Sequence, residues 1–302
     1  MSIDADWLVD RRRLKRRLTW WRVVAVVGAV VAVVAALGRF GVLVERAHVA
    51  RIDIDGLIAD DAERDQALSD VAENRAAKAL IVRINSPGGT VVGGEVLYRR
   101  LRQVGEKKPV VAVMGELATS AAYMTAIGSD YIFAHDGTLT GSIGVILQTA
   151  DLTGLLDKLG IKPETVKSSP LKAQPNPLEP FTAEAREATR KVVGGVYEMF
   201  VSMVEERRHL SRDLVGAVAD GSVFTGRQAK ANGLVDALGG EREARAWLEQ
   251  THGVPRSLPA RDVELHGPGE EIQDLLGALI GKTLFSERLT LDGVVSVWHP
   301  SR

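Results

Sequence analysis

The stretch PVVAVMGELATSAAYMTAIGSD, Pro109–Asp130, decides the fold. Its first part, Pro109–Glu116, is a continuous apolar run, which is typical of a strand buried on both faces of a parallel sheet. A helix is expected to begin near Ser120, directly after this strand. The sequence therefore predicts a strand-to-helix bend with a serine at its corner.

Strand-like and helix-like segments alternate on both sides of this unit, over residues 49–240. Strands are expected at His48–Ile58, at KALIVRI before the turn Ser86–Gly89, at Tyr131–Ala134 and at Gly141–Leu147; helices are expected at about residues 60–77 and at Gly93–Val104. This alternation predicts an α/β fold with parallel strands.

A proline-rich segment, Val166–Thr182, interrupts the alternation with four prolines. Prolines at this density exclude regular helix or sheet interior and predict a loop with a fixed course. The next helix is expected at Thr182–His209, with Thr182 as N-cap and Glu184 in the first turn. Its apolar stripe fits either an intramolecular core or a subunit interface, and comprises Val192, Val196, Met199, Phe200 and Met203.

The N-terminus predicts a membrane anchor. Basic residues from Arg11 to Arg22 precede an apolar run, and Trp20 and Trp21 lie at the junction, where an aromatic belt is expected. Residues 23–44 would extend about 33 Å as a helix, enough for a bilayer core of roughly 30 Å. The alternatives are a cleaved signal peptide and a buried core helix. The predicted division is a cytoplasmic segment 1–19, an anchor 20–44, a catalytic core 45–245 and a C-terminal helical extension 246–302, with an apolar pattern near residues 272–284.

Composition narrows the chemistry. The 302 residues carry a net charge of −1 and no cysteine, which excludes disulfides, thiol catalysis and cysteine-based zinc sites. The near-neutral charge gives no indication of a nucleic-acid partner. The sequence contains neither a Walker loop nor an HExxH motif, so no nucleotide or metal cofactor is predicted.

Ser120 has two interpretations. A serine before a helix is commonly an N-cap. A serine at a strand-to-helix bend can also be a nucleophile, because the helix N-terminus offers unpaired N–H groups to a developing oxyanion. Small neighbours, among them Ala118, Ala121 and Ala122, would let a substrate carbonyl approach closely.

The turn NSPGG, Asn85–Gly89, supplies a second source of backbone donors. Two glycines after a proline allow backbone N–H groups to face a ligand at short range. The N–H groups of Gly89 and Ala121 are therefore the predicted oxyanion hole.

The activating base is a histidine or a lysine. Among the six histidines, His135 is the best candidate for a triad. A free lysine is neutral only about once in a few thousand molecules at pH 7, so a lysine base must be desolvated away from carboxylates. Lys172 in the proline-rich segment fits this requirement, and Lys167 in the same segment is its rival.

Several segments together resemble one family. INSPGG, GELATSAAYM, TLTGSIGVI, VKSSPLK and DGSVFTGRQAKANGLVDALGG are similar, in this order over about residues 45–245, to segments of the S49 serine peptidases, the family of bacterial signal peptide peptidase A. The resemblance implies a spiral of ββα units related to the ClpP and crotonase folds.

The resemblance also implies roles for individual residues. Ser120 would be the nucleophile and Lys172 the general base, with Ser142 orienting the lysine and Gly89 donating to the oxyanion. Pro170, within KSSPLK, departs from the usual family pattern.

At the level of the whole protein, the resemblance implies a homo-oligomeric ring in which serine and lysine come from neighbouring subunits. It implies cleavage of signal-peptide remnants and other apolar peptides, at the outer side of the bacterial inner membrane. The alternatives are a catalytically inactive membrane scaffold of the same fold and a crotonase-type acyl-CoA enzyme.

Overall fold

The computed structural model describes residues 16–30 and 46–265. Residues 16–30 are helical and exposed. Within the described ranges, no helix combines the length and the apolar character that a bilayer crossing needs. Residues 31–44 of the predicted anchor and the apolar pattern at residues 272–284 lie outside these ranges.

Eight strands form one sheet in the order β6-β5-β3-β2-β1-β8, and β4 pairs with β3 and β7. The strands are β1 (His48–Ile58), β2 (Ala77–Gly89), β3 (Val110–Thr119), β4 (Tyr131–Ala134), β5 (Leu139–Gly141), β6 (Val223–Thr225), β7 (Ala237–Leu238) and β8 (Ala260–Asp262). All pairings are parallel except that of β5 with β6. The predicted α/β fold with parallel strands is confirmed.

The strand predicted at Gly141–Leu147 is wrong, because β5 ends at Gly141. Ser142 adopts a left-handed backbone with φ 49°, and its N–H donates to the carbonyl oxygen of Ser222 at 2.7 Å. This turn takes the chain out of the sheet immediately after β5.

The described core of the chain has eight helices, which are α2 (Ala62–Glu73), α3 (Val91–Gly105), α4 (Ala121–Ala126), α5 (Thr153–Lys158), α6 (Ala183–Arg208), α7 (Arg212–Val218), α8 (Gly226–Ala231) and α9 (Glu241–His252). The predicted N-cap of α6 is confirmed, since the Thr182 hydroxyl accepts from the N–H of Ala185 at 3.1 Å. The first turn of α6 contains Glu184, as predicted.

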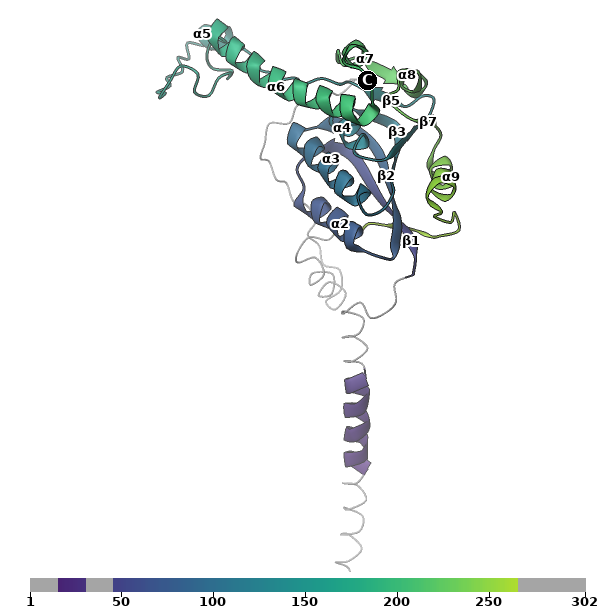
Figure 1. Ribbon diagram of the computed structural model, residues 1–302. Helices are drawn as coiled ribbons and strands as arrows, with labels where there is room; N and C mark the ends of the chain where they lie inside the picture. The colour runs from purple at the N-terminus through teal and green to yellow at the C-terminus, as the bar shows by residue number, and fades with distance from the viewer. Residues whose placement is uncertain (1–15, 31–45, 266–302) are drawn as a thin grey trace, which may run out of the picture.

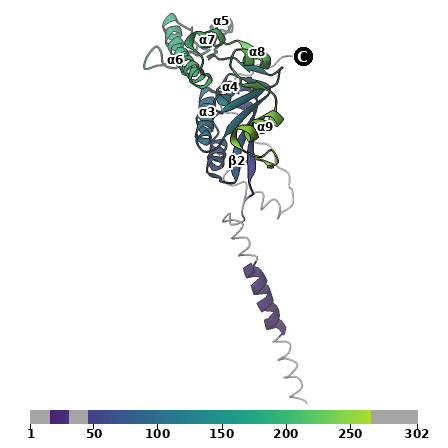
Figure 2. The same ribbon diagram turned by 45° about the vertical axis from the view of Figure 1, so that its right-hand side comes forward.

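Helices cover the sheet on both faces (Figures 1 and 2). On one face, α2, α3 and α4 pack over the larger core, to which α3 contributes Leu97 and Leu101. On the other face, Ala244 and Leu248 of α9 pack against a smaller apolar cluster that includes Phe133. Burial on both faces explains the continuous apolar run of β3.

Strand β3 changes its neighbour halfway along. Residues 111–114 pair with β4, whereas Leu117–Thr119 pair with Leu139–Gly141 of β5. The last part of β3 therefore lies between β2 and β5, and this is the part that leads into Ser120.

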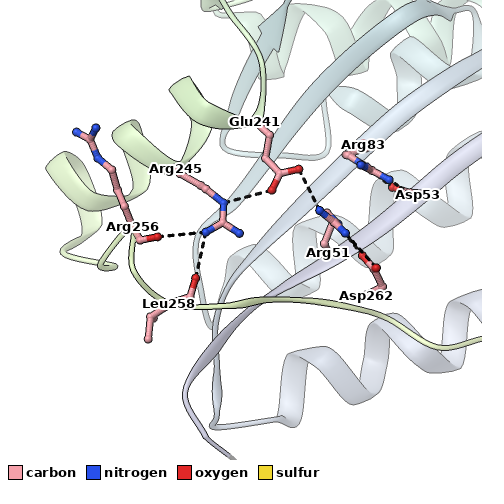
Figure 3. A network of polar contacts seen from close by, with 8 residues as sticks. All are labelled: Arg51, Asp53, Arg83, Glu241, Arg245, Arg256, Leu258 and Asp262. Carbon is pink, nitrogen blue, oxygen red and sulfur yellow. Dashed lines mark hydrogen bonds and ion pairs between the residues drawn. The ribbon is translucent and has the colours of Figure 1, made fainter.

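A charged network closes the C-terminal side of the described fold (Figure 3). The Arg51 guanidinium donates to the Asp262 carboxylate at 2.6 and 3.0 Å and contacts Glu241 at 3.3 Å. Arg245 of α9 donates to Glu241 at 3.2 Å and to the carbonyl oxygen of Leu258 at 3.0 Å. The sheet itself extends to Asp262, because β8 pairs with β1, and the network holds α9 against this edge.

Helix α6 has two different halves. Near its C-terminal end, Phe200, Val201 and Val204 are buried in the larger core. Near its N-terminal end, Val192 is 63% exposed. The apolar stripe therefore serves the intramolecular core at one end, and its other end is available to a partner. Figure 1 shows the N-terminal end of α6 and the segment before it standing away from the sheet.

The Tyr123→Phe variant should unfold with a free energy about 1–3 kcal/mol below that of the wild type. Tyr123 is fully buried and its hydroxyl donates to the carbonyl oxygen of Leu234 at 2.9 Å, so removal of the hydroxyl leaves that acceptor unpaired. Burial raises the pKa of Tyr123, which keeps the hydroxyl protonated as a donor.

Urea unfolding monitored by circular dichroism measures this effect. Tyr98→Phe is the matched control, because the half-buried Tyr98 hydroxyl makes no hydrogen bond to another described residue. Equal stabilities of the two variants would contradict the assigned role of the Tyr123 hydroxyl.

Candidate functional site

Ser120 lies between the end of β3 and the start of α4 with an unusual backbone. Its φ of 56° and ψ of −122° place a non-glycine residue in a strained region. Its N–H donates to the carbonyl oxygen of Gly141 at 2.9 Å, and its carbonyl oxygen accepts from the N–H of Met124 at 2.9 Å. The bend is therefore held by hydrogen bonds on both sides of the serine.

The Ser120 side chain does not cap α4, although the residue occupies the N-cap position. The interpretation of Ser120 as an ordinary helix cap is thus wrong. A half-buried hydroxyl on a strained bend, left out of the helix cap, is the arrangement found at serine nucleophiles on strand-to-helix turns.

The end of β2 lies directly against this bend, because the strand continues through Gly89 where the sequence predicted a turn at Ser86–Gly89. A Cβ atom on Gly88, whose φ is 105°, would come within 3.0 Å of the Ser120 Cβ and 3.1 Å of the Ala121 backbone nitrogen. Thr119 fixes this approach by donating its hydroxyl to the carbonyl oxygen of Pro87 at 3.0 Å. Close contact of the two backbones here requires a glycine at position 88.

Gly89 is the last residue of β2 and lies against β1. A Cβ atom there would come within 1.9 Å of the carbonyl oxygen of Ile58, and the N–H of the next residue, Thr90, donates to the same oxygen at 2.8 Å. The end of β2 is therefore held against β1 beside the Ser120 bend.

The structure therefore brings Ser120, Ala121, Gly89 and Ser142 to one edge of the sheet. Ser142 follows Gly141, whose carbonyl oxygen is bonded to Ser120, and is half-buried. Sequence reasoning did not identify Gly88, although the first glycine of SPGG was a visible signal. It did not identify Thr119 either, and no sequence pattern marks that residue.

Lys172 lies elsewhere in the chain. The proline-rich segment is exposed, as predicted for a loop, and sits at the outer N-terminal end of α6 (Figure 1). The Lys172 side chain is exposed and makes no hydrogen bond or ion pair within residues 16–30 and 46–265. The single chain thus does not join Lys172 to Ser120.

The rival lysine is already paired. Lys167 forms an ion pair with Glu179, and the two side chains are only 14% and 23% exposed. The hydrogen bond from the Lys167 ammonium lowers the pKa of Glu179. The Lys167 amine is therefore already engaged within the proline-rich segment and does not contact Ser120.

The histidine alternative has no geometric support. His135 follows β4, and its ring lies against Gly240, where a Cβ atom would come within 3.0 Å of its Cε1. In the described part of the chain, no hydrogen bond joins the His135 ring to Ser120.

Comparison with known proteins gives the class first. The chain is 40% identical over 211 residues to the putative protease slr0021 of Synechocystis, covering 69% of this chain and 76% of that protein. It is 34% identical to the chloroplastic serine protease SPPA of Arabidopsis thaliana, over 76% of this chain and 34% of that protein. The chain is 32% identical to the putative signal peptide peptidase SppA of Enterococcus faecium, over 67% of this chain and 63% of that protein. These relatives mark the chain as a serine protease.

The chain belongs to peptidase family S49, whose family model matches residues 102–255. A search of solved structures also finds a 1510-N membrane-bound stomatin-specific protease, at 17% identity and a TM-score of 0.49, covering 73% of this chain and 99% of that one.

The Gly88→Ala variant should lose at least about 100-fold in kcat/KM for peptide hydrolysis, as expected when a backbone oxyanion donor is displaced. A methyl group at this position would meet the carbonyl oxygen of Thr119 at 2.9 Å and push the Ser120 bend away. A fluorogenic peptide assay measures the loss.

Gly137→Ala is the matched control, since a Cβ atom there meets nothing within 4 Å. Both variants should remain folded by circular dichroism. Normal turnover by a folded Gly88→Ala protein would show that the approach of the two backbones has no catalytic role.

Proposed function

We propose that this chain is a membrane-anchored serine endopeptidase that uses a Ser-Lys dyad, with Ser120 as nucleophile and Lys172 as general base. The observation that carries the proposal is the geometry of Ser120. Its hydroxyl is not used to cap α4, and its backbone is held in a strained bend beside the SPGG turn.

The reaction begins with proton transfer. The neutral amine of Lys172 takes the hydroxyl proton of Ser120 as Oγ forms a bond to the peptide carbonyl carbon. The N–H groups of Gly89 and Ala121 donate to the resulting oxyanion. The Ala121 N–H is in the first turn of α4, where backbone donors have no partner within the helix.

The intermediate then collapses to an acyl-enzyme. The carbon–nitrogen bond breaks, and the ammonium of Lys172 returns its proton to the departing amine. Water, deprotonated by Lys172, attacks the acyl group, and Ser120 recovers its proton when the carboxylic acid is released. Ser142 orients the lysine through a hydrogen bond, which its place beside Gly141 supports.

The base is supplied by a neighbouring copy of the chain. From Ala183 to Phe200, where α6 enters the core, the helix rises about 26 Å, and Lys172 lies beyond the outer end. The exposed Lys172 side chain also lacks the desolvation that a neutral lysine requires. Docking against the Ser120 region of another copy would provide both proximity and desolvation.

The segment that carries Lys172 has the character of a subunit interface. None of residues 144–184, all of which are described, is buried in the single chain. Large apolar side chains are nevertheless exposed along it: Ile146, Leu147, Leu155, Leu159, Ile161, Val166, Leu171 and Leu178. Exposed apolar surface of this extent is typical of a protein–protein contact, which supports assembly into a homo-oligomeric ring.

The substrates are apolar peptides with small side chains, including signal-peptide remnants. The small size of the residues around Ser120, Ala118 and Ala122 among them, supports this preference. The name of the Enterococcus relative, a putative signal peptide peptidase, supports the substrate class.

The apolar segment at residues 20–44 anchors the chain in the bacterial inner membrane, a role supported by its composition. The arginine-rich flank stays in the cytoplasm and the catalytic core lies on the outer side. An anchored active site would meet apolar peptides where they are released. Membership of family S49 removes support from the acyl-CoA alternative.

Ser120→Ala and Lys172→Ala should each reduce peptide hydrolysis to background while the protein remains folded and assembled. A peptide assay and size-exclusion chromatography in detergent measure both properties. Hydrolysis by either variant at the wild-type rate would contradict the dyad. If both variants keep their activity, the nucleophile is another residue.

Mixing the two inactive variants tests where the base comes from. Subunits exchanged at one-to-one should recover about a quarter of the wild-type activity, because a random mixture places an intact serine beside an intact lysine at one ring interface in four. A mixture that exchanges subunits and stays inactive would show that serine and lysine act within one chain.

A further inference from the structure

Lys172 lies on a loop whose two ends are joined through the carboxylate of Glu179. The role that we infer for Glu179 rests on the proposed function of Lys172 as the general base. The loop runs from Lys167 to Glu179, and the ion pair between these residues joins its two ends. Lys172 lies near its middle, at the exposed side.

Glu179 binds two segments of the loop with one atom. Its Oε2 accepts from Lys167 Nζ at the start of the loop and from Gln174 Nε2, two residues after Lys172, at 2.7 Å. These contacts form on both sides of Lys172 in the sequence. Glu179 therefore determines how far apart the two limbs of the loop lie.

Near the end of the loop, the carbonyl oxygen of Pro177 accepts from the N–H of Leu152 at 3.0 Å. The hydrogen bonds around Lys172 itself are local. The N–H of Lys172 donates to the carbonyl oxygen of Ser169 at 3.1 Å, and that of Gln174 to Leu171 at 3.2 Å. Ala173 adopts a left-handed φ of 61°. These bonds shape the turn at Lys172, but each spans three residues and none fixes the turn relative to the loop ends.

The charges of the ion pair at the loop base are balanced. An unpaired carboxylate near Lys172 would favour the charged form of the lysine and oppose its action as a base. The ammonium of Lys167 neutralises Glu179 directly. The pair therefore joins the loop ends without adding net charge to the loop.

We propose that Glu179 is a positioning residue for the reaction: by pairing with Lys167 and holding Gln174, it closes the loop that presents the Lys172 amine to the active site of the neighbouring copy. Glu179 does not touch the substrate. It acts through the placement of Lys172.

The Glu179→Ala variant of the full-length protein in detergent should lose about 10–100-fold in kcat with KM changed less than about twofold, since misplacement of a catalytic group by about 1 Å has an effect of this size. Peptide hydrolysis kinetics measure both constants. Glu187→Ala is the matched control, because among the described residues Glu187 pairs only with Arg190, on the exposed surface of α6.

Exchanging the charges of Lys167 and Glu179 distinguishes a role in placing Lys172 from a general contribution to the stability of the loop. The double variant Lys167→Glu with Glu179→Lys restores an ion pair of opposite polarity, and Gln174 can turn its amide oxygen, which has no partner, toward the new lysine. This variant should recover kcat to within about fivefold of the wild type, consistent with renewed placement of Lys172.

Three results would overturn the inference. They are full activity of Glu179→Ala, loss of activity caused by dissociation of the assembly on size-exclusion chromatography, and no recovery in the charge-exchanged protein. Lys172→Ala identifies a failure of the proposed function itself: if that variant is active, the lysine is not the base. If it is inactive while Glu179→Ala is fully active, only the positioning role fails.

Discussion

The hydrogen bond from the N–H of Ser120 to the carbonyl oxygen of Gly141, at 2.9 Å, is the contact on which the rest of the site depends. It continues the pairing of β3 with β5 by one residue beyond Thr119. The chain must then turn sharply, because α4 begins at the next residue. This turn places a half-buried serine at the edge of the sheet, and only a glycine at position 88 lets the end of β2 approach it.

Much of the fold could be predicted because its strands are buried and therefore apolar. The strands His48–Ile58 and Tyr131–Ala134, and the capped helix after Thr182, follow from local composition. The stretch at residues 141–147 has strand-like composition as well, yet only its first residue lies in a strand. Its course depends on a hydrogen bond from Ser142 to Ser222, eighty residues away in the sequence, and no local pattern reveals such a bond.

The candidate site, like the fold, could be predicted from the sequence only in part. Ser120 and the SPGG turn stand out because each is a local feature with a local reason. The contact between Gly88 and the start of α4 joins segments that are distant in sequence, so the sequence did not indicate it. The choice between the two lysines is clarified by an ion pair of Lys167 with Glu179, twelve residues further on. Sequence spacing alone could not distinguish a paired lysine from an unpaired one.

The length of α6 has a consequence for how such a protein would be controlled. Each polypeptide carries the Ser120 hydroxyl in its core and the Lys172 amine beyond the outer end of this helix, which rises about 26 Å before it enters the core. A solitary molecule would hold every reactive group and still be inert. Hydrolysis would then switch on with the local concentration of the protein, and newly made copies would stay inactive until they meet one another.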